Sequence, residues 1–330
     1  MNLIDFFIKP ICLIIIAELS WNLFINLKSK EVRAKSTNSK KTSFYRHIKM
    51  LSEPSSPSKY IHNYLTLIVP ALLFILSVFA ILLFPLMTNS FFYHENNTIF
   101  FIFSILLAFP AAGIIIALTS QHFSRIQATK ELMTKVVQYY FSLILCTIAL
   151  YIMIYRFQSE AESSLAFTFK ELIEFQQSKS LSIFGIEVPA IFLFLNPIAF
   201  IAYMSSVIGL YRETNLDAAP KEMLRTWNVF EEFNGNRKAL LGLGQSVQFY
   251  LLVGLIVPLF LGIFWGSEDF ILALLKLVIS TTIIIQVLAL TAEGKPRVLL
   301  DRKIMAFVRT PLFLAIVSIL YSLFFEQFIQ

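Results

Sequence analysis

Four of the five carboxylates in one polar stretch of the chain, residues 211–240, lie in two pairs, and carboxylates in such a setting can carry protons. Glu213 and Asp217 are four residues apart, so a helical entry to the stretch would place both on one face. Glu231 and Glu232 come just before the next apolar run, with two basic residues close behind them. Burial raises the pKa of a carboxyl group and a nearby cation lowers it, which is how a proton relay is tuned. We therefore predict a proton or ion pathway here, with a solvated acidic and basic loop as the alternative.

Ionisable side chains also occur inside long apolar runs. Glu18, Lys276 and Arg309 lie within such runs. A charge inside the bilayer costs roughly 2.5–3.5 kcal/mol on insertion scales, so it usually faces a partner or water within the protein. We expect a buried partner for Lys276, because it lies too far inside its run for its stem to reach the headgroups readily. Glu131 lies at the end of a run, where it could be solvated or belong to the pathway.

No set of residues predicts a catalytic or metal site. The two cysteines, Cys12 and Cys146, lie in apolar runs and are too few to hold an iron–sulfur cluster. The histidines lack metal-ligand spacing, at His47, His62, His94 and His122. We predict no cofactor and no metal in this chain, and a stand-alone membrane enzyme is the least favoured class. A close-packing face, rather than a nucleotide-binding loop, is indicated by Gly242, Gly244, Gly254 and Gly262.

The elements that must position these residues are membrane-spanning helices. Of the 330 residues, 57% are apolar and only 15% are charged, against about 25% charged in a soluble domain. The apolar residues come in long blocks, which excludes a soluble globular enzyme and a disordered chain. We predict an all-α helix bundle that forms a single integral membrane domain over 1–330. Its eight spans would lie near 3–27, 63–88, 97–120, 134–156, 187–210, 241–265, 270–291 and 305–328.

The distribution of positive charge predicts the topology. Of the 27 Lys and Arg residues, 22 lie in or beside the loops 28–62, 121–133, 211–240 and 292–304. Positively charged loops stay in the cytoplasm, so the N-terminus would lie outside. The net charge of +6 then reflects topology and not nucleic-acid binding. We also expect amphipathic helices in the loops, at 43–53, 163–177 and 216–234.

Several segments together resemble a known family. The run ETN at 213–215 and the run EEFNGNRKALLGLGQSVQFY at 231–250 resemble the signature of the H-type membrane subunit of bacterial respiratory complex I. They are closer still to the homologous membrane subunit of formate hydrogenlyase and other energy-converting hydrogenases. The same pattern continues, in the family's order, in ATKEL at 128–132, ALLKLV at 273–278 and RKIMAFVRTPLFL at 302–314. The resemblance covers about residues 120–320.

The resemblance extends to individual residues and has gaps. The matched positions are Lys130, Glu131, Glu213, Asn215, Glu232, Gly235, Lys276, Arg309 and Pro311. Leu216 stands where the family has an arginine after the asparagine, and KSTNSKKT at 35–42 replaces its R-x-G-P element. A family glutamate in the fourth span is replaced by the region Gln138–Tyr140. These departures indicate a diverged member.

The resemblance implies a function within a large assembly. The chain would be the membrane anchor and coupling subunit of a complex that links a peripheral cytoplasmic arm to proton or sodium translocation in the bacterial inner membrane. It would belong to an oxidoreductase-type complex without being catalytic alone. Its partners would be antiporter-like membrane subunits, the arm and the lipid bilayer. The alternative, which the departures favour, is a non-redox ion or solute transport module, the membrane base of an ion-driven uptake complex.

Overall fold

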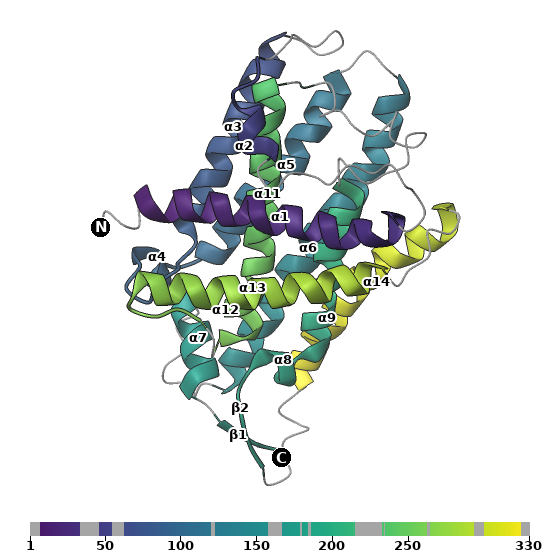
Figure 1. Cartoon of the computed structure of the whole chain (residues 1–330). Helices are drawn as coiled ribbons and strands as arrows, with labels where there is room; N and C mark the ends of the chain where they lie inside the picture. The colour runs from purple at the N-terminus through teal and green to yellow at the C-terminus, as the bar shows by residue number, and fades with distance from the viewer. Residues whose placement is uncertain are drawn as a thin grey trace.

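The computed structural model describes residues 7–33, 46–54, 63–119, 123–157, 167–178, 180–183, 186–214, 233, 235–262, 265–293 and 300–324. These residues form a bundle of helices with one small β-hairpin (Figure 1). The predicted all-helical class is confirmed apart from this hairpin. Its strands β1 (Ser180–Ile183) and β2 (Ile186–Pro189) pair antiparallel, with Ser180 opposite Pro189.

Long helices alternate with short ones along the chain. The long helices lie at the positions of the predicted spans and are α1 (Lys9–Arg33), α3 (Asn63–Leu83), α5 (Thr98–Thr119), α6 (Phe123–Phe157), α9 (Pro197–Thr214), α11 (Gly235–Gly254), α13 (Phe270–Glu293) and α14 (Leu300–Phe324). The short helices lie between them and are α2 (Arg46–Met50), α4 (Phe91–His94), α7 (Phe169–Ser178), α8 (Phe192–Leu195) and α12 (Ile256–Phe260).

Three helical stretches in the described part of the chain are long and apolar enough to cross a membrane. They are Val136–Phe157 in α6, Gly235–Phe260 in α11 and α12, and Phe270–Ala289 in α13. Shorter apolar stretches lie in α3, α5, α9 and α14. The count of eight crossings and an N-terminus on the outside stay predictions.

The span predicted at 187–210 begins ten residues late, at Pro197. Asn196 caps α9, because its Oδ1 accepts a hydrogen bond from the N–H of Ala199 at 3.0 Å. Proline suits the first helical position, where its missing N–H is not needed. The apolar residues before this cap form β2 and α8 instead. Asn196 also ties α9 to α14, since its Nδ2 donates to Ser322 Oγ at 2.9 Å.

Other helix boundaries differ from the prediction as well, among them those of α6 and α3. Helix α6 begins at Phe123, so most of the stretch 121–133, which was predicted as a loop, continues the helix. Helix α3 ends at Leu83, five residues before the predicted end of its span. The residue before a proline is disfavoured in helical conformation, and Pro85 stands two positions beyond Leu83.

Helix α11 lies at the centre of the bundle. Every residue from Leu241 to Gly254 is buried, and the helix packs against α1, α2, α3 and α13. Helices α1 and α13 run side by side and cross α11 (Figure 1). On another side of the bundle, α14 packs against α6 and α9. Residues of α11 can therefore contact segments that are far apart in the sequence.

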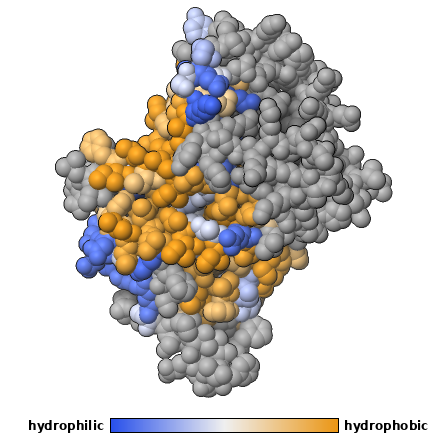
Figure 2. Space-filling model, viewed as in Figure 1, coloured by the Kyte–Doolittle hydropathy of each residue, from blue (hydrophilic) through white to orange (hydrophobic). Residues whose placement is uncertain are grey.

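The face formed by α1 and α13 is strongly apolar (Figure 2). Helix α13 exposes Ile271, Leu275, Ile279 and Ile283, one on each successive turn, and α1 exposes Ile11. An apolar face of this extent is unusual on a protein surrounded by water. It suits contact with lipid or with another membrane protein.

A buried glutamine, Gln176, caps the C-terminal end of α12, the short helix that follows the central helix α11. The last carbonyl groups of a helix have no partner inside the helix. At the end of α12, Gln176 of α7 donates from Nε2 to the carbonyl of Pro258 at 3.0 Å. Its Oε1 accepts from the N–H of Gly262 at 2.9 Å. The side chain is fully buried, so it replaces the water that would otherwise bind these groups.

Replacing Gln176 by methionine should lower the stability of the protein. The change keeps the length of the side chain but leaves buried backbone groups near Pro258 and Gly262 without partners. Each such loss costs about 1–3 kcal/mol, which thermal unfolding in detergent would detect as a lower Tm. The exposed neighbour Gln177, whose Nε2 donates only to the carbonyl of Gly262, is the control. An equal effect of Gln177→Met would contradict this explanation.

Candidate functional site

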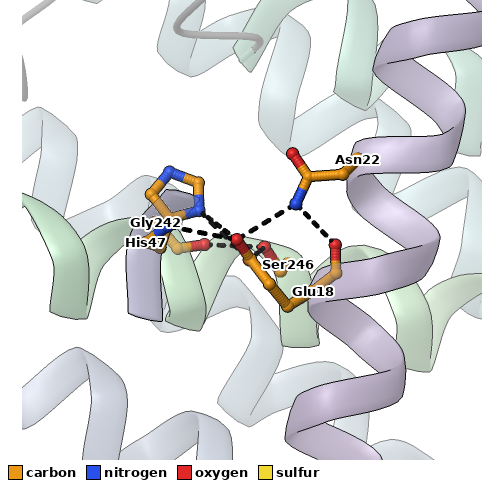
Figure 3. Close-up of polar contacts among 5 residues, drawn as sticks. All are labelled: Glu18, Asn22, His47, Gly242 and Ser246. Atoms are coloured by element: carbon orange, nitrogen blue, oxygen red, sulfur yellow. Dashed lines mark hydrogen bonds and ion pairs between the residues drawn. The ribbon is translucent and has the colours of Figure 1, made fainter. Parts of the chain in front are cut away.

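A carboxylate that is fully buried joins three separate segments of the chain. Glu18, in the middle of α1, is 0% exposed. The ring nitrogen Nδ1 of His47, on α2, lies 3.0 Å from Glu18 Oε1 and 3.1 Å from Oε2 (Figure 3). The backbone N–H of His47 also donates to Oε1, at 3.3 Å. At these distances one proton bridges the carboxylate and the imidazole.

Two further side chains complete the site. Ser246 of α11 contacts Glu18 Oε2 through its hydroxyl at 2.9 Å. Asn22, one turn along α1, donates from Nδ2 to Glu18 Oε1 at 3.1 Å and to the backbone carbonyl of Glu18 at 2.8 Å. All of these partners are themselves buried. The four residues Glu18, Asn22, His47 and Ser246 are called the Glu18 site below.

A glycine makes room for the imidazole. The ring of His47 lies so close to Gly242 that a β-carbon there would overlap ring atoms Cδ2 and Nε2. Gly242 is one turn before Ser246 on α11, so one face of this helix both accepts the ring and contacts the carboxylate. The predicted close-packing role is confirmed for Gly242. The group that packs there is a side chain rather than a second helix.

The segment after α2 is also held against the start of α11. The backbone N–H of Asn236 donates to the carbonyl of Glu53 at 3.0 Å. Gly235 has φ +58, and a β-carbon there would overlap the carbonyl of Pro54. Only glycine adopts this conformation readily and allows so close an approach. Residues 47–54 are therefore fixed to α11 at two places, the Glu18 site and the Gly235 turn.

The Glu18 site has the parts needed to hold and pass a proton. An imidazole is the side chain that ordinarily changes charge between pH 5 and 8, and the Glu18 carboxylate lies within hydrogen-bond distance of one. The Ser246 hydroxyl has two acceptors within 2.9 Å, Glu18 Oε2 and the carbonyl of Gly242, but only one proton to donate. It can therefore turn from one to the other as the charge on Glu18 changes. A titratable group inside a membrane bundle indicates a functional site.

A second buried polar cluster, between α5, α6 and α11, is made of neutral groups. Tyr140 of α6 donates to the carbonyl of Leu106 at 3.0 Å and contacts the amide of Gln248 on α11. Gln248 Nε2 also donates to the carbonyl of Leu106, at 2.9 Å. These groups can bind one another or water, but none of them takes up charge easily. The Gln138–Tyr140 region thus supplies a hydrogen-bonded tyrosine where the family resemblance leads us to expect a glutamate.

Comparison with known families gives the evolutionary relationship. The family model for NADH dehydrogenase matches residues 41–323, far more than half of the chain. The chain belongs to the NADH dehydrogenase family. This confirms the relationship to complex I that the sequence motifs indicated.

A solved structure supports the fold of this NADH dehydrogenase family member. A chain from the structure of the membrane-bound sulfane sulfur reductase, an archaeal respiratory membrane complex, matches with a TM-score of 0.66 at 16% sequence identity. The match covers 96% of this chain and 99% of that one. Comparison with curated protein sequences finds no significant match. The protein is thus membrane-embedded, and it is a membrane subunit of the kind found in complex I-like respiratory complexes.

Most of the predicted pathway and family-motif residues of this family member cannot be compared with the Glu18 site. Asn215, Asp217, Glu231 and Glu232 lie outside the described residues. The backbone places four others on helices, although their side chains are not described: Lys130 and Glu131 on α6, Glu213 on α9 and Arg309 on α14. Of the predicted pathway carboxylates, Glu18 is the one whose surroundings the structure describes.

The other three predicted residues have local roles. Lys276 is half-buried, and its Nζ donates to the carbonyl of Gly266 at 2.9 Å, so its described partner is a loop carbonyl. Gly235 forms the turn beside Pro54. The carbonyl of Pro311 accepts from Ser142 Oγ at 3.0 Å, which joins α14 to α6.

Sequence reasoning missed the partners of Glu18. His47 is 29 residues away from Glu18 and Ser246 is 228 residues away. Two signals were present. Glu18 needed an interior partner, because it lies in an apolar helix. His47 lies in the predicted amphipathic segment 43–53, whose apolar face needs a surface to pack against.

Proposed function

We propose that this chain is the membrane anchor and coupling subunit of a multi-subunit complex, and that the protonation of Glu18 and His47 links a peripheral arm to ion movement. The observation that supports this is one buried carboxylate holding α2 against α1 and α11. A change of charge at Glu18 alters the free energy with which α2 docks. By linkage, a displacement of α2 alters the proton affinity of Glu18 to the same extent.

The partners in this proposal follow from the predicted topology. The arm would contact the loops 28–62 and 211–240 on the cytoplasmic side and act on α2. Other membrane subunits, antiporter-like ones among them, would pack along the apolar faces, with lipid over the rest. Glu213, Glu231 and Glu232 would continue the path for protons or sodium ions. The membrane in this proposal is the bacterial inner membrane.

One observation favours a second function. The neutral Tyr140–Gln248 contact, in the region where a family glutamate is expected, suits a chain that has lost a redox-linked proton path. The chain would then be the base of a non-redox ion or solute transport module. Purification of the tagged protein with its partners distinguishes the two. A nickel–iron large-subunit-like protein among them supports the first function, and antiporter-like proteins without it support the second.

Replacing Glu18 by glutamine should abolish ion translocation while the complex still assembles. Glutamine keeps the volume and can still accept from Asn22 and His47, but it cannot release a proton. The measurement is proton and sodium flux in membrane vesicles, together with recovery of the complex on a native gel. Glu174 of α7, an exposed carboxylate, provides the control Glu174→Gln. Unchanged flux through an intact Glu18→Gln complex would reject the proposed role.

A further inference from the structure

A groove of about 120 Å³ opens on the surface of α6 near the C-terminal end of that helix. It is lined by Ile148, Tyr151, Ile152, Tyr155 and Phe167. None of these residues belongs to the Glu18 site or to the predicted pathway. The groove lies on the helix that contains an apolar membrane-crossing stretch, so its natural surroundings are hydrocarbon.

The groove is lined by four residues on one face of α6 and, on the opposite side, by one residue outside a helix, Phe167. Ile148, Tyr151, Ile152 and Tyr155 follow the spacing i, i+3, i+4 and i+7, which puts them on one side of a helix. Tyr151 is buried, and its hydroxyl is satisfied because it donates to the carbonyl of Thr168 at 2.9 Å. Tyr155 is 44% exposed. The groove therefore has a buried aromatic floor and an open mouth.

Phe167 forms the far wall in an unfavourable backbone conformation. Its φ is 48, in the left-handed region that residues with a side chain rarely adopt. Its ring packs edge-on against Tyr151, with 4.8 Å between ring centroids, and against Phe100, with 5.5 Å. Strain of this kind persists only where neighbouring contacts impose it, and it is common at ligand sites. Without the Phe167 ring the face of α6 would be an open helix surface.

An exposed cation, Arg156, is adjacent in sequence to one of the lining residues of the groove. Arg156 follows Tyr155 in the last turn of α6 and is exposed. It has no ion pair within the residues that the structure describes. The end of a membrane-crossing helix lies near the lipid headgroups, where arginine attracts phosphate.

We propose that this groove holds one acyl chain of an anionic phospholipid whose phosphate pairs with Arg156. The groove runs for about 10 Å along the helix, which is the length of seven residues. A volume of 120 Å³ accommodates a stretch of one hydrocarbon chain. A helix of a partner protein is about 10–12 Å wide with its side chains and does not fit into it. The site is thus a lipid site rather than a docking site for a protein helix.

Native mass spectrometry of the full chain in detergent tests this proposal by titration with phosphatidylglycerol and phosphatidylcholine. The wild type should bind the anionic lipid about fivefold more tightly, since both headgroups carry a phosphate but the choline ammonium offsets the charge that attracts Arg156. Arg156→Gln should remove this preference. Lys170→Gln is the matched control, because Lys170 is a nearby cation that already lies 3.9 Å from Glu174, and it should keep the preference.

A second variant tests the acyl-chain part of the proposal. Ile152→Trp fills the groove from its side and should weaken the binding of both lipids, while Arg156→Gln affects the anionic lipid alone. Equal binding of the two lipids by the wild type would overturn the proposal. So would a preference that survives Arg156→Gln, or lipid binding that Ile152→Trp leaves unchanged.

Discussion

Replacing Glu18 by alanine should destabilise the protein by about 3–5 kcal/mol, the cost of removing one partner of a buried charged pair. The change removes the carboxylate oxygens that His47 Nδ1 contacts, while Ser246 Oγ and Asn22 Nδ2 each keep one backbone carbonyl as a partner. His47→Ala should be of similar severity, because it leaves the carboxylate buried without its imidazole. Unfolding in detergent, followed by circular dichroism, measures both effects.

The double variant Glu18→Ala/His47→Ala is the decisive comparison. If the two side chains act as a pair, removing the second costs little once the first is gone, and the two effects are not additive. Ser77→Ala is a suitable control at a buried hydroxyl, since its close contact is with Leu73 in its own helix at 2.8 Å. Additive costs in the double variant would show that Glu18 and His47 contribute separately.

Replacing Gly242 by alanine should push α2 away from α11. The new methyl group would overlap the imidazole of His47, which cannot move without breaking its contact with Glu18. Overpacking of this kind costs about 1–3 kcal/mol, and ion flux should fall with the loss of the Glu18–His47 contact. Thermal unfolding and vesicle flux measure the two consequences.

Gly254 offers a matched control on the same helix. A β-carbon there would lie 3.4 Å from Phe84 Cζ and 3.9 Å from Leu277 Cδ1, which are ordinary contacts. Alanine also favours a helix over glycine by up to about 1 kcal/mol, so Gly254→Ala should be neutral or slightly stabilising. In addition, His47→Ala should relieve the strain caused by Gly242→Ala. If Gly242→Ala and Gly254→Ala behave alike, the overlap with His47 does not govern the effect.

The helices could be predicted from the sequence because the bilayer allows few backbone conformations. Long apolar runs must form helices that satisfy their own backbone groups. Helices α5, α13 and α14 lie close to their predicted spans, and α3 and α6 overlap theirs with one shifted end each. The start of α9 could not be read in this way. Residues 186–195 are as apolar as the helix that follows, and only the Asn196 cap before Pro197 marks the boundary.

The candidate site was predictable only in part. Glu18 was identifiable because a carboxylate in an apolar helix is costly, and Gly242 was identifiable as a close-packing residue. Their common partner, His47, was not, because a five-residue helix has little periodicity to reveal which face is buried. The docking of α2 depends on the Gly235 turn and on contacts with Glu53 and Pro54. These are long-range contacts that no local pattern encodes.

The wide sequence separation within the Glu18 site has a consequence for biosynthesis. A ribosome makes α1 before α2 and α11, and at that stage the hydrogen-bond partner of Glu18 within the same helix is Asn22. His47 follows 29 residues later, and Ser246 only 228 residues later, after most of the other long helices. Until then α1 carries a carboxylate whose insertion is opposed by about 2.5–3.5 kcal/mol. Helix α1 is therefore made before α2 and α11, and Glu18 gains its full set of contacts only after α11 has been made.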